Sequence, residues 1–572
     1  MTTADPTGDP TTADGAADPA TDHDQVLASS AVMAAGTMVS RLSGFVRSTL
    51  LAAALGASVH AELFTIGNTI PNMLYILLAG GIFNAVLVPQ LVRAMRNDPD
   101  GGEAYTNRIM TLAGLFLAAV TVLLVAAAPL VMSVLLNGQY AEARLADERQ
   151  SAIDFARYCL PQVFFYGMFV LVGQILNARG RFGPMMWAPI ANNVISVAVL
   201  VIYLVTFGPA SKLEQLSSFT TDQELVLGIG STLGIVAQLL ILLPYLGAAG
   251  FHYRPRFDFR GTGLGHTLRL GIWTVLFVIV NQIAYVVVVR LASGGPAESG
   301  EGTGITIYSG AFLIMMVPHS IITVSLATAI LPRLSTHAAE HDLAGLARSL
   351  ASTLRSALAV VVPFAALLPI IAPDVANVIW GHGATADVFE RYVPSLALFG
   401  GGLVLFTVHY LMLRGFYAME QTRTVFFIQC AVAATNIAAA LVLVARTDAA
   451  DTSPALVLAY TAAYAVGSLV SYAVLRSRLG GLGSPQLLRF GLRLLAVVAG
   501  ATAAAAALAW LLGGPVGGLS QQPHWSIAAA RAAAVTALDV VAFVLLARAL
   551  RLREVTSVID TVTRRLPAFG RR

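Results

Sequence analysis

The chain has 572 residues, of which 57% are hydrophobic and only 12% are charged. Soluble domains carry about 25% charged residues, so this composition excludes an ordinary soluble enzyme, and the high apolar content excludes a disordered protein. The length allows more than a dozen membrane helices of about 20 apolar residues each. The two cysteines, Cys159 and Cys430, are too few for a disulfide framework or a zinc site.

The first 26 residues form an acidic segment that is rich in Pro, Gly, Thr and Asp and has no Lys or Arg. Such a segment cannot bury enough apolar surface to fold, so residues 1–26 are predicted to be a disordered acidic tail. The basic region of a signal peptide is missing. The tail could bind a partner or could simply be solvated.

Fourteen apolar stretches follow the tail. Each is a continuous run of helical length, unlike the short alternating segments of a membrane barrel. The sequence therefore predicts an all-α integral membrane protein with about 14 transmembrane helices. The predicted spans are 27–57, 60–92, 109–137, 152–178, 184–207, 225–250, 267–293, 304–332, 350–380, 388–413, 424–445, 454–475, 488–513 and 526–549.

The positive charges alternate between the loops on the two sides. If the N-terminus is cytoplasmic, 25 of the 35 basic residues fall on the cytoplasmic side, seven fall outside and three lie within spans. This asymmetry predicts that both termini are cytoplasmic. The basic residues that give the net charge of +4 are thus interpreted as determinants of membrane topology, so nucleic acid is not an expected partner.

Similar turns recur six spans apart, Arg179–Gly180 after the fourth span and Arg414–Gly415 after the tenth. We interpret this spacing as two pseudo-symmetric six-helix lobes, which place a substrate site at their interface, although short motifs can also match by chance. The predicted parts are an N-lobe at 27–260, a C-lobe at 261–480, two extra helices at 481–551 and a basic cytoplasmic tail at 552–572.

Two arginines, Arg41 and Arg47, lie inside the first span. A charge deep in a bilayer costs at least ~2.5–3.5 kcal/mol, so it normally faces a cavity or a partner. The two positions lie about 240° apart on an ideal helix, and Gly44 between them could allow a bend towards one cavity. Two guanidinium groups suit a phosphate or pyrophosphate, while structural pairing, for example with Glu62, is the alternative.

Four further residues are weaker or more ambiguous candidates. Glu62 opens the second span, where it could pair with an arginine, gate the outer mouth or remain solvated as a helix-start acid. Asn68 and Asn72 flank a proline that frees backbone carbonyls inside the same span. Arg290 lies near the outer end of the seventh span and could bind an anion or extend to the headgroups.

The sequence carries none of the familiar catalytic motifs. H-E-x-x-H, the P-loop and Gly-x-Ser-x-Gly are all missing, so the chain is predicted not to be an enzyme and to need no cofactor or metal. Without a motif for ATP hydrolysis, transport would be coupled to the membrane potential or to a monovalent cation.

Four stretches resemble one known family. SRLSGFVRSTLLAAALGA (40–57) and the IPN…AGGIFNAVLVP region (70–89) resemble the lipid II flippases, the MurJ (MviN) family of the MOP exporter superfamily. ILNARGRFGPMMWAPIANN (175–193) and RGFYAMEQTRT (414–424) resemble its other landmarks. The resemblance implies a V-shaped cavity between two lobes, with the last two helices forming a groove for a lipid tail.

The resemblance also assigns site residues. The family's two cavity arginines on helix 1 fall on Arg41 and Arg47, and its helix 2 acidic residue falls on Glu62. Half of its usual cationic set is missing, which leaves open a divergent branch or a different lipid-linked substrate. Ser48 stands where the family has an acidic residue, and Tyr75 and a position near Leu313 stand where the family has arginines.

The implied function is flipping of lipid II from the inner to the outer leaflet of the bacterial cytoplasmic membrane by alternating access, in peptidoglycan synthesis. A related exporter of another lipid-linked saccharide and a transport-inactive cell-wall scaffold are the alternatives. The expected partners are a lipid-linked anionic substrate and membrane lipids, and they could include cell-wall synthesis or division proteins. The chain is expected to be a monomer.

Overall fold

The computed structural model describes residues 19–78, 88–259, 264–513, 524–552 and 554–555. Within these ranges every regular element is a helix. Most of the predicted acidic tail falls outside them, but its last residues, from Pro19, already form the start of the first helix. A proline in the first turn followed by aspartates is typical of a helix N-terminus, which explains this difference from the predicted boundary.

The first half of the chain, called the N-half below, comprises α1 to α11. Its helices are α1 (Pro19–Leu55), α2 (Val59–Gly67), α3 (Thr69–Ile76), α4 (Val88–Asn97), α5 (Glu103–Ala126), α6 (Ala128–Leu135), α7 (Ala146–Cys159), α8 (Gln162–Ala178), α9 (Gly183–Phe207), α10 (Thr221–Leu240) and α11 (Leu243–Ala248). Helix α9 packs between α1 and α10, while α2 packs on α7 and α5 packs on α8.

The second half, called the C-half, comprises α12 to α19, and two terminal helices follow it. The helices are α12 (Leu264–Ala292), α13 (Gly294–Glu298), α14 (Ile305–Pro318), α15 (Val324–Ala339), α16 (Leu343–Trp380), α17 (Tyr392–Ala418), α18 (Thr422–Val444), α19 (Thr452–Arg478), α20 (Ser484–Leu511) and α21 (Trp525–Ala549). Helix α17 packs between α16 and α19, and α18 packs against α12 and α19.

Twelve segments among the described residues are long and apolar enough to cross a membrane, and they match predicted spans three to fourteen. The first predicted span corresponds to α1. The second corresponds to α2, α3 and α4 together with residues 79–87, which lie outside the described residues. The all-helical membrane fold is therefore confirmed, and the count of fourteen stays a prediction.

Prolines explain why several single predicted spans are broken in the structure. Pro129 and Pro244 lie at the starts of α6 and α11, each of which follows a longer helix of the same span. Pro318 precedes a π-helical turn, His319–Thr323, between α14 and α15. Proline removes a backbone donor and clashes with the preceding turn, so an apolar run continues across the membrane as two shorter helices.

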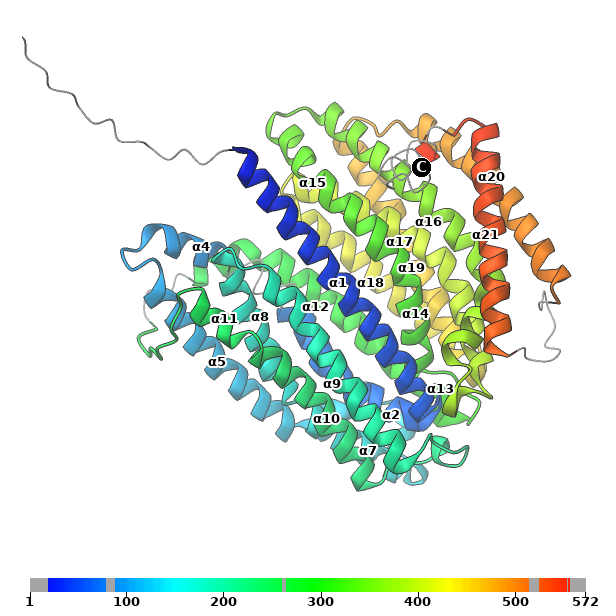
Figure 1. The fold of residues 1–572 in the computed structure, drawn as a ribbon, viewed down its shortest axis with the longest axis horizontal. Helices are drawn as coiled ribbons and strands as arrows, with labels where there is room; N and C mark the ends of the chain where they lie inside the picture. Colours follow the sequence, from blue (N-terminus) through cyan, green and yellow to red (C-terminus); the bar gives the residue numbers. More distant parts are fainter. Residues whose placement is uncertain (1–18, 79–87, 260–263, 514–523, 553, 556–572) are drawn as a thin grey trace, which may run out of the picture.

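The two halves converge at one end of the molecule and separate at the other (Figure 1). At the end near α2, α7 and α13 they share one large apolar core, which includes Leu63 from the N-half and Ile305 from the C-half. Towards the other end each half has a core of its own, around Leu171 and Leu411 respectively. We call the joined end the closed end.

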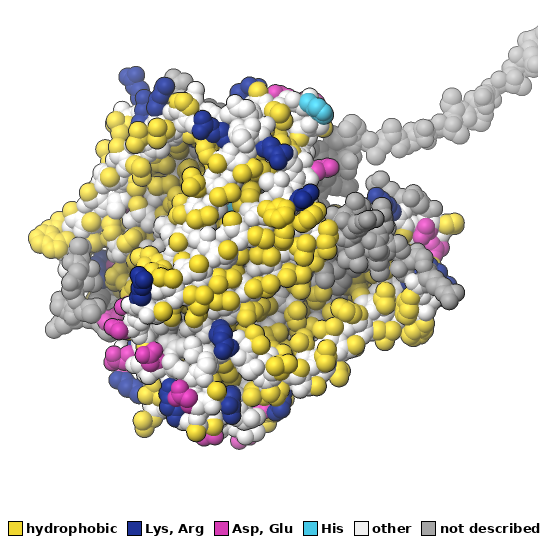
Figure 2. Space-filling model, turned by 180° about the vertical axis from the view of Figure 1, so that it is seen from behind, with side chains coloured by type: hydrophobic (Ala, Val, Ile, Leu, Met, Phe, Trp, Pro, Cys, Tyr) yellow, Lys and Arg dark blue, Asp and Glu magenta, His cyan; other side chains and the backbone are white. Residues whose placement is uncertain are grey.

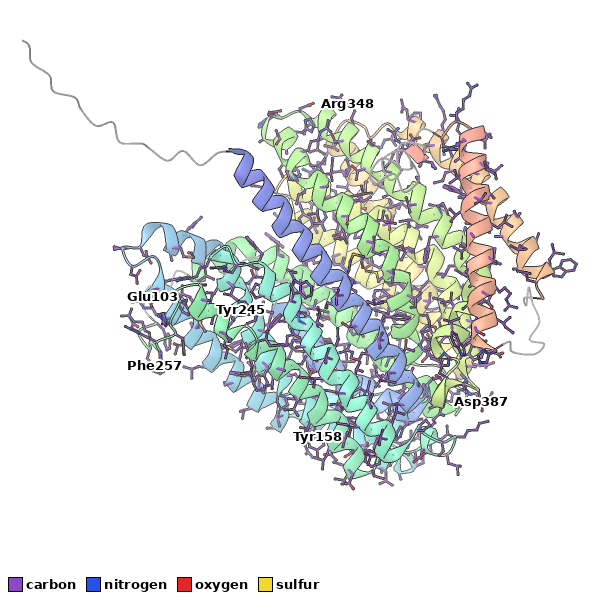
Figure 3. All side chains as sticks on the ribbon, in the orientation of Figure 1. Glu103, Tyr158, Tyr245, Phe257, Arg348 and Asp387 are labelled. Carbon is purple, nitrogen blue, oxygen red and sulfur yellow. The ribbon has the colours of Figure 1, made fainter. Side chains whose placement is uncertain are left out.

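Charged side chains gather mainly towards the two ends of the molecule, and apolar side chains cover most of the surface between them (Figure 2). Arg348 and Asp387, labelled in Figure 3, lie at the opposite and the closed end of the C-half respectively. Helix α1 starts and α21 finishes at the same end, the one opposite the closed end (Figure 1).

A buried ion pair attaches the terminal helices to the C-half. The Nε of Arg531 in α21 lies 2.9 Å from both carboxylate oxygens of Asp374 in α16, and its terminal nitrogen contacts the same carboxylate. Both side chains are buried. From the sequence, Arg531 counts as a basic residue at an outer loop margin, but the structure uses it to join two helices.

Candidate functional site: a cationic cavity between the two halves

A cavity of about 1000 Å³ lies between the halves. Its walls come from α1, α2 and α3 on one side and from α12, α14, α15, α17, α18 and α19 on the other. Six tyrosines and several amides line it, so the wall combines aromatic faces with hydrogen-bonding groups. The amide-bearing residues are Asn68, Asn72, Asn281, Gln282, Gln429 and Asn436.

The formal charges of this cavity are all positive. Arg47 from α1 and Arg414 from α17 line it, and no Asp or Glu belongs to its described wall. A second cavity of about 350 Å³ adjoins α1 and α14 and is lined by Arg41 and Arg47, again without a described acidic residue. Guanidinium groups that line a cavity without a described carboxylate favour an anionic ligand.

Arg41 and Arg47 line the smaller cavity together, although α1 runs without interruption through Gly44. Neither arginine makes a hydrogen bond or ion pair with another described residue. Gly44 faces the amide of Asn193 in α9, which donates to the Ser40 carbonyl at 2.9 Å. The contact between Gly44 and Asn193 is an ordinary one that would leave room for a Cβ, so the structure gives Gly44 no special role in bending or packing α1. The two arginines remain free to meet a ligand.

Glu62 is fully buried and joins the two halves at the closed end. Its two carboxylate oxygens accept hydrogen bonds from the first backbone N–H groups of α14, that of Ile305 at 3.0 Å and that of Thr306 at 2.7 Å. These N–H groups have no partner within their own helix, and the helix dipole favours a negative group there. A side chain on Gly304 would clash with the carboxylate, so glycine allows this close approach.

The weaker candidates separate into two groups. Asn68 and Asn72 line the larger cavity, and the Asn72 side chain donates to the Asn68 carbonyl at 2.9 Å. Arg290 lines neither cavity. Its guanidinium donates to the carbonyls of Ser133 and Val134 at 2.7 and 3.0 Å, so it joins α12 to the end of α6.

The positions that depart from the resembled family have different surroundings. Ser48 and Leu313 line the smaller cavity, while the ring of Tyr75 lies 4.8 Å from that of Tyr166. The structure thus has no cation at these three places.

Sequence reasoning missed Arg414 as a cavity residue, because it counted this arginine among the cytoplasmic loop charges. Arg414 lies within α17, one turn before the helix ends. A usable signal was present, since Tyr410 and Tyr417 occur four before and three after it and therefore share its helix face. No cluster of three or more His, Cys, Asp or Glu side chains that could hold a metal occurs among the described residues.

A helical bundle with a polar cavity between two halves is the architecture of a membrane transporter. The fold is similar to a solved lipid II flippase MurJ in an inward closed conformation, with a TM-score of 0.68, 16% identity, and coverage of 91% of this chain and 99% of that one. It is also similar to an inward-facing MATE family transporter of the MOP superfamily, with a TM-score of 0.61, 16% identity, and coverage of 77% and 95%.

The sequence comparisons identify the family. The family model described as lipid II flippase MurJ matches residues 51–513. A probable lipid II flippase MurJ of Haemophilus influenzae is 25% identical over 68% of this chain and 75% of its own length, and one of Vibrio cholerae is 27% identical over 70% and 74%. The chain is a multi-pass membrane protein that belongs to the lipid II flippase MurJ family, as its motifs predicted.

Proposed function

We propose that this chain moves lipid II from the inner to the outer leaflet of the bacterial cytoplasmic membrane by alternating access. The observation that carries the proposal is the cavity between the halves, which presents unpaired arginines and no described carboxylate. Lipid II carries a pyrophosphate between its lipid and its saccharide. Family membership supports lipid II as the particular substrate.

In this mechanism, Arg41 and Arg47 bind the pyrophosphate, while Asn68 and Asn72 hydrogen-bond the head group. A guanidinium fork can donate two parallel N–H groups to phosphate oxygens, which an ammonium cannot do. The tyrosines and amides of the larger cavity offer hydrogen bonds and apolar faces to a saccharide. The lobes at 27–260 and 261–480 would rock against each other around this site.

The orientation follows from the charges. We propose that the closed end faces outward and that both termini are cytoplasmic, because the loops predicted to be cytoplasmic hold 25 of the 35 basic residues, and one of these residues, Arg348, lies at the end opposite the closed end (Figure 3). The cavity then faces the cytoplasm, where the substrate is made, and Glu62 holds the outer end shut. Arg290 would stabilise the same closure through α6.

The driving force is proposed to be the membrane potential or a monovalent cation, since the MATE-like fold is compatible with ion coupling. A potential that is negative inside favours outward movement of an anion and return of an empty cationic carrier, by ~2.3 kcal/mol per charge per 100 mV.

A second candidate is export of another lipid-linked saccharide. The observation that favours it is the loss of charge at Ser48, Tyr75 and Leu313, which changes the electrostatics around the head group. Both candidates share the pyrophosphate site. They differ in which precursor accumulates on the cytoplasmic face when the protein is depleted.

Arg41→Ala and Arg47→Ala test the proposal when compared at matched membrane levels in a flipping or complementation assay. Each variant should lose most activity, and Arg→Lys should not fully restore it because the planar fork is lost. Wild-type activity in both alanine variants would show that the arginines are structural and that the anion site lies elsewhere. It would also reopen the possibility of a transport-inactive scaffold.

A further inference from the structure

Arg414 is the second positive charge of the larger cavity, beside Arg47. It lies in α17, four residues before the helix ends at Ala418, whereas α17 begins at the closed end with Tyr392. The larger cavity is lined by Phe64, from the shared core at the closed end, and by Tyr417, so it extends from the closed end to the last turn of α17. An anion that enters from the opposite end would pass Arg414 on its way to Arg47.

Two tyrosines hold this guanidinium in place. Its central carbon lies 4.3 Å from the ring centre of Tyr410 and 5.8 Å from that of Tyr417, and a terminal nitrogen donates to the Tyr410 hydroxyl. Stacking on aromatic rings orients a guanidinium without neutralising its charge. The arrangement thus fixes the donors of Arg414 before any ligand arrives.

The donors of Arg414 are only partly used. Its Nε is buried and has no hydrogen-bond partner among the described residues, and no ion pair joins it to a described carboxylate. A buried donor that is left unpaired destabilises the protein, and more so when the group is charged. Arg414 lines the cavity and one terminal nitrogen contacts Tyr410, so its remaining N–H groups can donate to a ligand oxygen in the cavity.

Arg179, which the sequence pairs with Arg414, provides an internal comparison. The structure places Arg179 at the end of α8, immediately before the turn at Gly180, whereas Arg414 lies inside α17, so the predicted turn at Arg414–Gly415 is wrong. Its guanidinium lies 5.2 Å from the Phe251 ring and donates to the Ala249 carbonyl at 3.1 Å. Arg179 lines neither cavity. Arg179 therefore stabilises a turn, whereas Arg414 lines the cavity with N–H groups that have no hydrogen-bond partner among the described residues.

We propose that Arg414 forms an entry subsite for a lipid-linked phosphate or pyrophosphate, separate from the Arg41–Arg47 site on α1. The subsite captures the oxyanion at the cytoplasmic side of the cavity and passes it to Arg47. The inference rests on the proposed function for the identity of the ligand, but its evidence is the geometry of α17. The same chemistry could come from a membrane phospholipid headgroup, and the experiment separates the two sources.

The test measures binding to the purified full-length chain by native mass spectrometry. The probes are undecaprenyl pyrophosphate and, separately, phosphatidylglycerol. Arg414→Gln should lower the affinity for undecaprenyl pyrophosphate by at least about ten-fold, because it removes a charge-assisted hydrogen bond. Arg179→Gln, the matched control, should leave the affinity unchanged.

The outcomes distinguish the inference from the proposed function. If Arg47→Ala abolishes binding and Arg414→Gln binds like wild type, the entry subsite is refuted and the proposed function stands. If wild type binds neither probe selectively and Arg47→Ala changes nothing, the proposed function fails. If Arg414→Gln weakens phosphatidylglycerol as much as undecaprenyl pyrophosphate, the site is a general phospholipid site and the inference is wrong.

A thermal melt of each variant guards against a folding defect. If Arg414→Gln unfolds at a lower temperature than wild type, the affinity of Arg414→Lys is the deciding measurement. Lysine retains the charge and much of the packing of the aliphatic stem but lacks the planar guanidinium fork. A lower affinity of Arg414→Lys for undecaprenyl pyrophosphate supports the subsite, and wild-type affinity in that variant overturns it.

Discussion

Glu62→Gln should weaken the closed end and shift the protein towards outward opening. The carboxylate accepts two backbone N–H groups of α14 at 3.0 and 2.7 Å in a fully buried position. Glutamine keeps one acceptor oxygen, but its NH₂ group then faces the second N–H donor. Hydrogen bonds to charged groups contribute about 1.5–3 kcal/mol, so losing one should change the ratio of closed to open protein by roughly 10- to 100-fold.

Accessibility of a cavity residue from outside the cell measures this shift. Ser309→Cys introduces a thiol that lines both cavities, in a background where Cys159 and Cys430 are replaced by alanine. Labelling by a membrane-impermeant maleimide should be slow in this background and faster with Glu62→Gln. The rate should rise with the open population if opening is fast relative to labelling.

Glu224→Gln is the matched control for the Glu62 experiment. Glu224 is also a buried carboxyl, but its partner, the Ser151 hydroxyl, belongs to the same half of the molecule. Its replacement should not change labelling of the Ser309→Cys thiol. Equal labelling in the parent and Glu62→Gln proteins, or an equal increase in both glutamine variants, would refute the gating role of Glu62.

Two further predictions concern stability and topology. Asp374→Ala should lower the free energy of unfolding by about 3–5 kcal/mol, because it leaves the Arg531 charge buried and unpaired. Asp374→Leu combined with Arg531→Leu should lower it much less. Equal thermal shifts in the single and double variants would contradict this account. A cysteine at Ser299 should react with an impermeant reagent from outside and one at Ser484 should not, because the distribution of basic residues predicts that Ser484 is cytoplasmic. Reversed labelling would overturn the proposed orientation.

The helices could be predicted because each span is marked in the sequence by its own continuous apolar run. A continuous apolar run such as Gly183–Phe207 has no stable alternative to a helix in lipid, since every backbone group must be hydrogen-bonded internally. The positions at which a span breaks into two helices are harder to predict from its prolines. Pro189 and Pro363 lie within continuous helices, whereas Pro129 and Pro244 coincide with breaks, so the surroundings decide whether a proline divides a span.

The site could be predicted only in part, for a different reason. Arg41 and Arg47 were found because a charge inside an apolar run is conspicuous. The role of Glu62 could not be decided, because its partner Ile305 is 243 residues away in the sequence. Arg414 was missed because charge counting treats every arginine near a helix end as a loop residue, whereas in the structure it lies inside α17 and lines the cavity.

The closed end holds polar contacts of unequal strength, and this inequality explains why Glu62 should dominate its opening. The Lys212–Asp387 ion pair is 3.0 Å long but highly exposed, so water replaces it on opening at a cost of about 0–1 kcal/mol. Glu62 is fully buried, so its carboxylate and its two N–H partners must all find new partners when the halves separate. Lys212→Ala should therefore leave labelling of the Ser309→Cys thiol almost unchanged, and a response as large as that of Glu62→Gln would show that exposed contacts control the outer gate.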